Sequence, residues 1–246
     1  MTGRRKLPRE GRHAHLNDLR TFKGVEAWVF DLDNTLYPAD TDLFSQINER
    51  IGAYVAELLG LDRDAAEVRQ KAYYKTYGTT LRGLMMEHDV DPDDFLAKAH
   101  DIDYSAVKPN VALQGAIRSL PGKKYIFTNG DRPHAERTAA ALGITDLFDD
   151  IFDIVAAGLV PKPNRETYDL FLKNTGVSPV RAAMFEDLSQ NLTVPHKLGM
   201  RTVLVVPPNT RDMFQGDWEM EGDRAPHVDF VTDDLTGFLK AVPKDL

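Results

Sequence analysis

Residues 29–37 read Val-Phe-Asp-Leu-Asp-Asn-Thr-Leu-Tyr, a short apolar run that leads into two carboxylates one residue apart. The apolar residues predict a buried strand. Side chains alternate along a strand, so Asp31 and Asp33 are expected to share a direction at its end. At about 4 Å, with an effective dielectric of about 20, the two charges repel by roughly 4 kcal/mol. Such a pair favours a bound cation or a retained proton, although an acidic turn after a buried strand would have the same sequence.

The residues after this stretch are predicted to be helical as far as about Asp101. Apolar residues recur at helical spacing from Leu43 to Leu59, and further helices are expected after Asp62 and over 72–88. Asp91 followed by proline is typical of a helix start.

From Pro109 onward, predicted strands alternate with predicted helices: helices over 111–120, 133–142, 165–174 and 192–198, and strands over 124–128, 154–157, 182–185, 202–206 and 228–231. Alternation of this kind predicts an α/β fold, with a parallel sheet covered by helices on both faces. The helical segment is then an insertion directly after the first strand.

The predicted domain organisation has three parts. Residues 1–24 form a basic N-terminal arm, residues 25–37 and 109–246 form the α/β core, and residues 38–108 form the inserted helical block. The arm carries +5 of a net charge of −8, which leaves −13 on the rest of the chain. A solvated terminus and an arm that binds RNA or a partner share this composition. The polar segment 207–226 has no predicted element, which is typical of a functional or mobile loop.

The composition excludes several classes of protein. No apolar run approaches the roughly 20 residues needed to cross a bilayer, and the basic start of the chain has no apolar stretch after it. We therefore expect neither a membrane partner nor a secretory signal. The absence of cysteine excludes disulfides and thiolate sites and is compatible with the cytoplasm. An acidic body binds nucleic acid poorly, so no nucleic-acid partner is expected.

Polar residues also follow the other predicted strands, where ligands lie in open parallel sheets. Thr128 and Asn129 follow one strand, Lys162 lies between two prolines, and Glu186 and Asp187 follow another strand. Taken singly, these residues also suit a turn, an exposed loop lysine and the acidic start of a helix. Together they suit phosphoryl transfer, which needs a nucleophile, an acid/base and positive charge. Oxygen ligands in this number suit Mg²⁺.

These motifs resemble those of the haloacid dehalogenase-like phosphatase superfamily over roughly residues 26–206. The resemblance implies a Rossmann-like core and a helical cap inserted after the first motif. It implies that Asp31 is the nucleophile that becomes an aspartyl-phosphate, and that Asp33 is the general acid/base and also gives its backbone carbonyl to Mg²⁺. It implies that Asp187 is a direct Mg²⁺ ligand, with Glu186 behind it, and that Asp31 also belongs to the metal site.

The resemblance assigns the binding of the phosphoryl group to Thr128 and Lys162, and Lys162 also serves catalysis. Asn129 and Arg132 are added as candidate substrate contacts beside the predicted phosphate site. An acid at position 33 favours a phosphatase, because the transport ATPases that resemble this motif carry threonine there and the dehalogenases lack the metal-binding acids.

More narrowly, residues 33–37, 77–81 and 127–131 resemble the pyrimidine 5′-nucleotidase branch, in which Asn34 replaces a glycine common elsewhere in the superfamily. This resemblance implies a nucleoside monophosphate substrate, CMP or UMP. Tyrosines that follow the first motif could stack on the base, although most are expected to pack the cap's own helices: Tyr37, Tyr73, Tyr74 and Tyr77. The alternatives are a sugar-phosphate or phosphoglycolate phosphatase, and a catalytically silent nucleotide-binding regulator. We expect a monomer or a homodimer.

Overall fold

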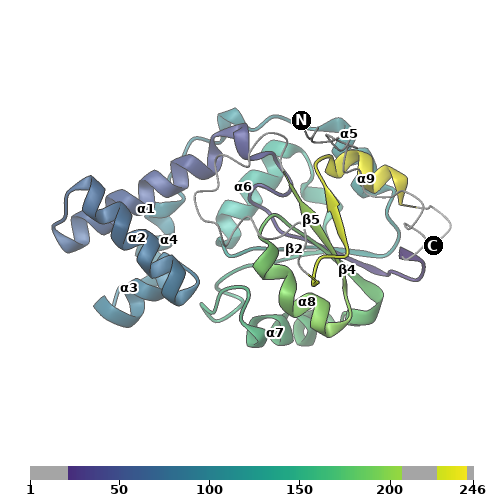
Figure 1. Ribbon diagram of the computed structural model, residues 1–246. Coiled ribbons are helices and arrows are strands. Elements are labelled where there is room, and N and C mark those ends of the chain that lie inside the picture. Colours follow the sequence, from purple (N-terminus) through teal and green to yellow (C-terminus); the bar gives the residue numbers. More distant parts are fainter. Residues whose placement is uncertain (1–21, 207–225, 243–246) are drawn as a thin grey trace, which may run out of the picture.

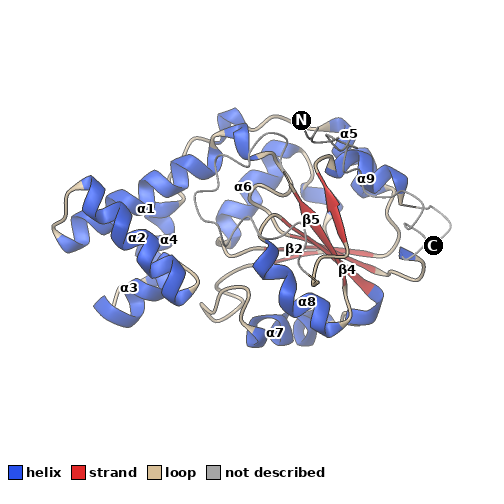
Figure 2. Ribbon diagram, in the orientation of Figure 1, coloured by secondary structure: helices blue, strands red, loops and turns tan. Residues whose placement is uncertain are grey.

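The computed structural model describes residues 22–206 and 226–242, and most of the predicted basic arm and of the 207–226 loop lies outside the described residues. Within the described part of the chain, six strands form one parallel sheet in the order β3-β2-β1-β4-β5-β6. The strands are β1 (Ala27–Phe30), β2 (Lys123–Phe127), β3 (Asp150–Phe152), β4 (Ala182–Glu186), β5 (Arg201–Val205) and β6 (Phe230–Thr232). The predicted α/β fold class is confirmed, and the first strand lies in the middle of the sheet, between β2 and β4. Figure 2 shows the strands gathered into one sheet with helices around it.

Helices cover both faces of this sheet. One layer holds α5 (Val111–Arg118), α6 (Arg132–Leu142) and α9 (Leu235–Ala241), and the other holds α7 (Arg165–Thr175) and α8 (Thr193–Leu198). Along β1, Trp28 and Phe30 pack into the first layer, whereas Ala27 and Val29 pack into the second. Each large apolar side chain buried in this way contributes about 1.5–3 kcal/mol to stability. Burial on both faces explains why β1 is an uninterrupted apolar run.

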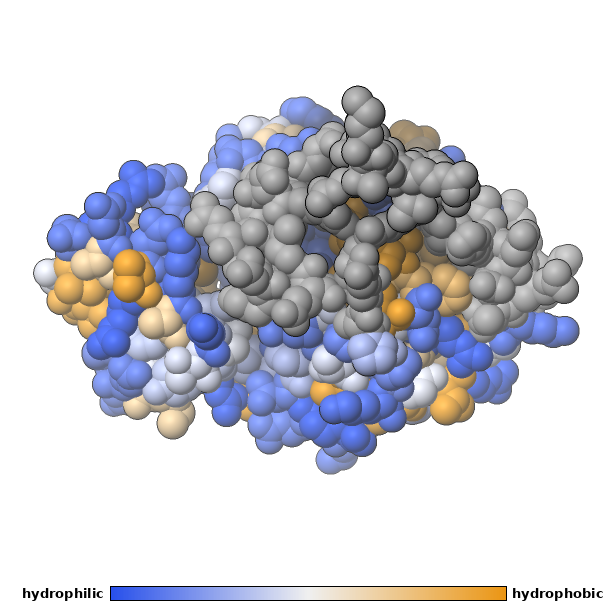
Figure 3. Space-filling model, in the orientation of Figure 1, coloured by the Kyte–Doolittle hydropathy of each residue, from blue (hydrophilic) through white to orange (hydrophobic). Residues whose placement is uncertain are grey.

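The inserted residues form a separate group of helices beside the core: α1 (Leu43–Leu59), α2 (Arg63–Tyr77), α3 (Thr80–His88) and α4 (Pro92–Ala99) (Figure 1). They share a hydrophobic cluster that includes Val55, Tyr73 and Phe95. The surface of this group in view is mainly hydrophilic, with apolar residues gathered at its outer end (Figure 3). The exact limits of the cap and core remain a prediction.

Two segments join this group to the core, and they are fastened to each other. The Gln46 side chain of α1 accepts a hydrogen bond from the backbone N–H of Asp103 at 3.0 Å and donates one to its carbonyl at 3.2 Å. Short 3₁₀ helices complete the described chain: η2 (Ala39–Thr41), η3 (Tyr104–Ala106), η4 (Thr145–Leu147), η5 (Pro179–Arg181) and η6 (Ser189–Leu192).

Two expectations about secondary structure were wrong, and one helix was not expected. The helical stretch 72–88 is divided, because Gly78 has a φ of 86° and the Thr79 side chain caps the next helix. The strand expected at 154–157 is a turn around the Asp153 side chain, which accepts a hydrogen bond from the N–H of Ala156. Helix α9 was not expected.

Candidate active site

A buried lysine lies between two carboxylates at the carboxyl end of the sheet. Nζ of Lys162 lies 2.7 Å from Asp31 Oδ1, 2.8 Å from Glu186 Oε2 and 2.7 Å from the carbonyl of Phe127. The lysine is 1% exposed, so all three of its donors are used inside the protein. Burial by itself lowers the pKa of Lys162, but the charges of Asp31 and Glu186 outweigh it and raise the pKa. The ammonium is therefore permanently charged.

The local chain explains how these groups meet. Asp31 follows β1 and its N–H donates to the carbonyl of Phe185, which extends the pairing with β4 and brings Glu186 alongside. Lys162 comes from the long loop after β3. Its N–H donates to Asn129 Oδ1 at 2.8 Å, and Asn129 Nδ2 donates to its carbonyl at 3.4 Å. Asn129, expected to contact substrate, thus holds the backbone of the lysine.

Three carboxylates form a group that could hold a metal ion. Oxygen atoms of Asp31, Glu186 and Asp187 all lie within 4.8 Å of one another. With Lys162 counted, the fully ionised group carries a net charge of −2, and its donors are all oxygen, which suits a hard divalent cation. The Oδ1 atom of Asn34 is buried without a hydrogen-bond partner, which leaves one more oxygen available at this site.

Asp31 and Asp187 resist ionisation when no cation is bound. Burial and Glu186 raise the pKa of Asp31 from 3.8 to about 7, although Lys162 opposes the shift. Burial, Glu186 and Asp31 likewise raise the pKa of Asp187 well above its ordinary value. One lysine does not neutralise three carboxylates, two of them buried, so a cation would stabilise their charged forms.

Asp33 lies in different surroundings. β1 ends at Phe30 and Asp33 belongs to the following turn, so strand alternation is not what sets the direction of its side chain. Its Oδ1 accepts hydrogen bonds from Tyr37 Oη at 2.6 Å and from His134 Nε2 at 2.8 Å. Burial by itself raises the pKa of Asp33, but the interaction with His134 and the hydrogen bond from Tyr37 outweigh it and lower the pKa.

The turn after β1 depends on Asn34. Its φ is 58°, in the left-handed region that asparagine and glycine tolerate best. Its buried side chain also makes a hydrogen bond to Asp187 that lowers the pKa of that carboxyl. Asparagine therefore takes the backbone shape that glycine would take and adds a contact to the acidic group.

Thr128 and Arg132 complete the set of predicted residues. Thr128 is buried directly after β2, and its Oγ1 accepts a hydrogen bond from the N–H of Gly130 at 2.9 Å. The guanidinium of Arg132 donates to Asp150 at 2.9 Å and to the carbonyl of Ile151. Its side chain is thus engaged at the end of β3, and no hydrogen bond joins it to the carboxylate group within the described residues.

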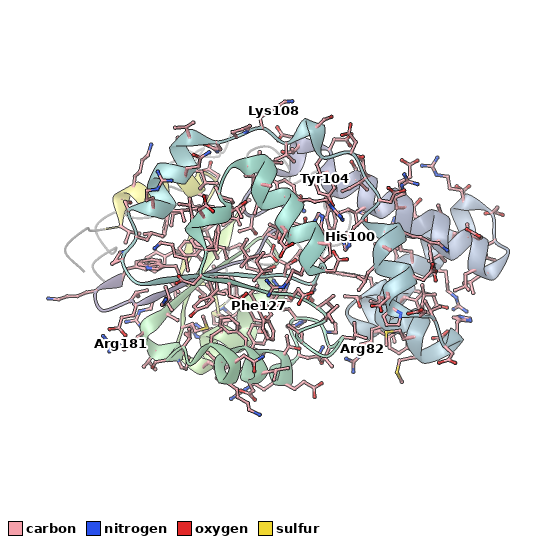
Figure 4. All side chains as sticks on the ribbon, turned by 180° about the vertical axis from the view of Figure 1, so that it is seen from behind. Arg82, His100, Tyr104, Lys108, Phe127 and Arg181 are labelled. Carbon is pink, nitrogen blue, oxygen red and sulfur yellow. The ribbon has the colours of Figure 1, made fainter. Side chains whose placement is uncertain are left out.

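The structure adds residues that the sequence did not indicate: His134, Tyr104 and His100. The signal for His134 was a histidine in the first turn of a helix that starts at the ligand-binding edge of the sheet. His100 and Tyr104 lie where the inserted helices meet the core (Figure 4). They line a cavity of about 800 Å³ between α4 and α6, together with Asp131 and Arg137. The guanidinium of Arg137 lies over the Tyr104 ring and donates a hydrogen bond to the carbonyl of His100, so it is engaged within the protein.

Residues 25–191 match the model of the haloacid dehalogenase-like hydrolase family, and the chain belongs to that family. Among curated proteins it is similar to Phosphate metabolism protein 8 of Saccharomyces cerevisiae, with 29% identity over 197 residues. That match covers 73% of this chain and only 61% of the length of the yeast protein.

Solved structures show the same fold at low identity. A haloacid dehalogenase-like phosphatase from Thermococcus onnurineus has a TM-score of 0.57 and 18% identity, covering 90% of this chain and 99% of that one. CbbY from Rhodobacter sphaeroides, solved with phosphate, has a TM-score of 0.58 and 20% identity, and the match covers 89% of this chain and 99% of CbbY. L-2-haloacid dehalogenase from Xanthobacter autotrophicus has a TM-score of 0.55 and 20% identity, covering 89% and 98%. No helix among residues 22–206 and 226–242 is long and apolar enough to cross a membrane.

Proposed function

We propose that this hydrolase is a Mg²⁺-dependent phosphomonoesterase that acts through an aspartyl-phosphate on Asp31. The observation that carries the proposal is the grouping of Asp31 with Lys162, Glu186 and Asp187, separate from a second acid, Asp33, that has its own hydrogen-bond donors. A group of three carboxylates that can hold a cation favours a phosphatase over a dehalogenase within the family.

The residues present divide the reaction between two carboxylates. Asp31 attacks phosphorus and the bond from phosphorus to the ester oxygen breaks, while Asp33 gives its proton to the departing alkoxide. Asp33 then takes a proton from water, the water oxygen attacks the aspartyl-phosphate, and inorganic phosphate leaves with Asp31 restored. The positive charge of Lys162 and a hydrogen bond from the Thr128 hydroxyl stabilise the negative charge on the phosphoryl oxygens. Mg²⁺, held by Asp31, Asp187, the Asp33 carbonyl and Glu186 behind them, would supply further positive charge there.

A pyrimidine nucleoside 5′-monophosphate is the proposed substrate. The run 77–81, one of the stretches that resemble the 5′-nucleotidase branch, packs against the core: a Cβ at Gly78 would lie 3.1 Å from Pro161, next to Lys162. Tyr73 and Tyr77 bind Glu87 within the helical block, whereas the Tyr74 hydroxyl accepts a hydrogen bond from Gln190 of the core at 3.5 Å. Tyr74 is therefore the tyrosine of the block best placed to meet a base.

The test is a panel of phosphorylated metabolites assayed with Mg²⁺: CMP, UMP, purine nucleotides, sugar phosphates and phosphoglycolate. The proposal expects phosphate release that is fastest with CMP or UMP and that stops with a chelator. Preference for a sugar phosphate or phosphoglycolate would contradict the proposed nucleotide substrate but would still support a phosphatase. Nucleotide binding without release of phosphate from any ester would indicate a catalytically silent regulator instead. A location in the cytoplasm and a monomeric or dimeric state remain predictions.

A further inference from the structure

The hydrogen bonds on Asp33 are unevenly distributed between its two oxygens. Oδ1 accepts from both Tyr37 and His134, at 2.6 and 2.8 Å. Within the described residues, Oδ2 accepts no hydrogen bond, and the side chain is 16% exposed. One oxygen is therefore fixed, and the other is free to exchange a proton with a ligand.

The proton on His134 is directed toward Asp33 by a third residue. Tyr104 Oη lies 2.9 Å from His134 Nδ1, on the opposite side of the imidazole from Asp33. The single proton of the Tyr104 hydroxyl has two acceptors, His134 Nδ1 at 2.9 Å and the carbonyl of His100 at 3.4 Å. When Tyr104 donates to the nearer of them, Nδ1, the single proton of a neutral imidazole resides on Nε2 and is donated to Asp33. A phenol, an imidazole and a carboxylate thus form one chain of hydrogen bonds.

The ring of His134 is held on its other sides as well. It is fully buried, and His100 stacks on it with ring centroids 4.5 Å apart and an interplanar angle of 8°. Asp131 Oδ1 accepts a hydrogen bond from the backbone N–H of His134 at 2.9 Å and lies 3.0 Å from Nδ1 of the stacked His100, so it fixes the backbone below one ring and the position of the other. An imidazole restrained in this way can restrain the carboxylate that it contacts.

We propose that His134 is a positioning residue for Asp33, with Tyr104 setting its tautomer. By holding Oδ1, His134 aims Oδ2 at the ester oxygen in the first half of the reaction and at water in the second. The role rests on the proposed phosphatase function. Because general acid catalysis contributes typically about 10²–10⁴-fold, misdirecting Oδ2 should be costly only where the leaving group needs a proton.

The experiment compares two leaving groups in the complete Mg²⁺-loaded protein. One substrate is the best alkyl ester of the metabolite panel, and the other is p-nitrophenyl phosphate, whose phenolate departs without a proton. We measure kcat/KM, which reports on the steps up to release of the alcohol. His134→Ala should lower kcat/KM by about 10²-fold for the alkyl ester and by under about threefold for the aryl ester. His134→Gln should restore much of the loss, because its amide N–H can replace Nε2.

The matched control is Thr138→Val, one turn further along α6, where a fully buried hydroxyl has no hydrogen-bond partner. Thr138→Val should leave kcat/KM unchanged for both substrates. Equal losses for both esters in His134→Ala would show a merely structural role and overturn the inference while the phosphatase stands. A wild-type protein that hydrolyses neither ester would overturn the proposed function, and the inference with it.

A second measurement needs no activity. Imidazole ¹⁵N NMR of the metal-free protein should show a protonated Nε2 and an unprotonated Nδ1 for His134, assigned by the signal lost in His134→Gln. The Tyr104→Phe variant should shift the Nδ1 resonance. A proton on Nδ1 and none on Nε2 would contradict the proposed direction of the hydrogen bonds, even where His134→Ala does not fold.

Discussion

Asp31 and Asp33 are two residues apart, yet their surroundings act on them in opposite directions. Asp31 meets a lysine together with two further carboxylates, and its pKa rises to about 7. Asp33 meets a tyrosine and a histidine, and its pKa is lowered. The difference teaches that sequence spacing does not decide the chemistry of a carboxylate pair. The turn that separates the two side chains gives each its own partners.

The largest expected effect comes from removing the carboxylate of Asp31. Asp31→Asn should lower phosphate release on the order of 10⁵-fold, because the amide cannot form the aspartyl-phosphate. The thermal midpoint should not fall greatly, since one of three mutually repelling carboxylates has been neutralised. Steady-state phosphate release and circular dichroism melting check both points. Asp40→Asn, at an exposed site, is the control, and substantial turnover by Asp31→Asn would sink the assignment.

Replacing Lys162 tests how far the carboxylate group around Asp31 depends on the positive charge of this lysine. Lys162→Met should destabilise the protein by about 3–5 kcal/mol, because it leaves buried carboxylates without their partner. The difference in unfolding free energy between Lys162→Met and the wild type should shrink as the pH falls, because the carboxylates are then protonated. Urea unfolding at two pH values measures it, with exposed Lys173→Met as the control. A small, pH-independent deficit would mean that the three carboxylates do not interact as described.

The pH dependence of stability should separate the two residues without any mutation. The folded chain binds a proton on Asp31 more tightly than the unfolded chain does, because its folded pKa of about 7 exceeds 3.8. This contribution is fully present below about pH 4 and is lost as the pH rises to about 7, on the order of a few kcal/mol. The contribution of Asp33 to stability changes with pH in the opposite direction. Because its pKa is lowered in the folded chain, Asp33 stabilises the fold at pH values above the ordinary pKa of an aspartate, and this contribution is lost as the pH falls.

Urea unfolding in a chelator, from about pH 4 to about pH 8, would record this fall. Adding Mg²⁺ should restore stability, increasingly so toward high pH where the carboxylates are ionised. Asp31→Asn should flatten the metal-free curve. A metal-free curve that rises between these pH values would contradict the raised pKa of Asp31.

The smallest expected effect concerns the second donor to Asp33. Tyr37→Phe removes a hydroxyl from Oδ1 while His134 remains, and should lower kcat/KM for an alkyl ester by about tenfold. The stability loss should be about 1 kcal/mol, as for one hydrogen bond. Tyr77→Phe, whose hydroxyl bonds Glu87 within the helical block, is the matched control. If Tyr37→Phe has no effect, His134 alone holds the carboxylate.

Much of this organisation could be predicted from the sequence. The apolar run before Asp31, the alternation after Pro109 and the proline-flanked Lys162 each follow from local rules, and the structure places Asp31, Lys162, Glu186 and Asp187 together. Local rules suffice there because parallel strands present their carboxyl ends at one edge of the sheet.

The partners of Asp33 could not be predicted in this way. His134 lies 101 residues from Asp33 in the sequence, and Tyr104 belongs to the segment that returns from the helical block. Their meeting depends on how that segment lies against α6, which no periodicity encodes. The turn after β1 could not be predicted for a related reason, because the left-handed φ of Asn34 that shapes this turn has no signature in the periodicity of the sequence.

The backbone of Asn34 has a consequence for mutational tolerance. Position 34 must satisfy two independent demands, a φ of 58° and an amide that bonds Asp187. Glycine meets the first demand only, aspartate brings a further negative charge to an acidic group, and a β-branched residue meets neither. In a saturation library selected for phosphate release, this position should therefore accept few residues, with glycine the best tolerated of them, although no reaction step passes through its side chain.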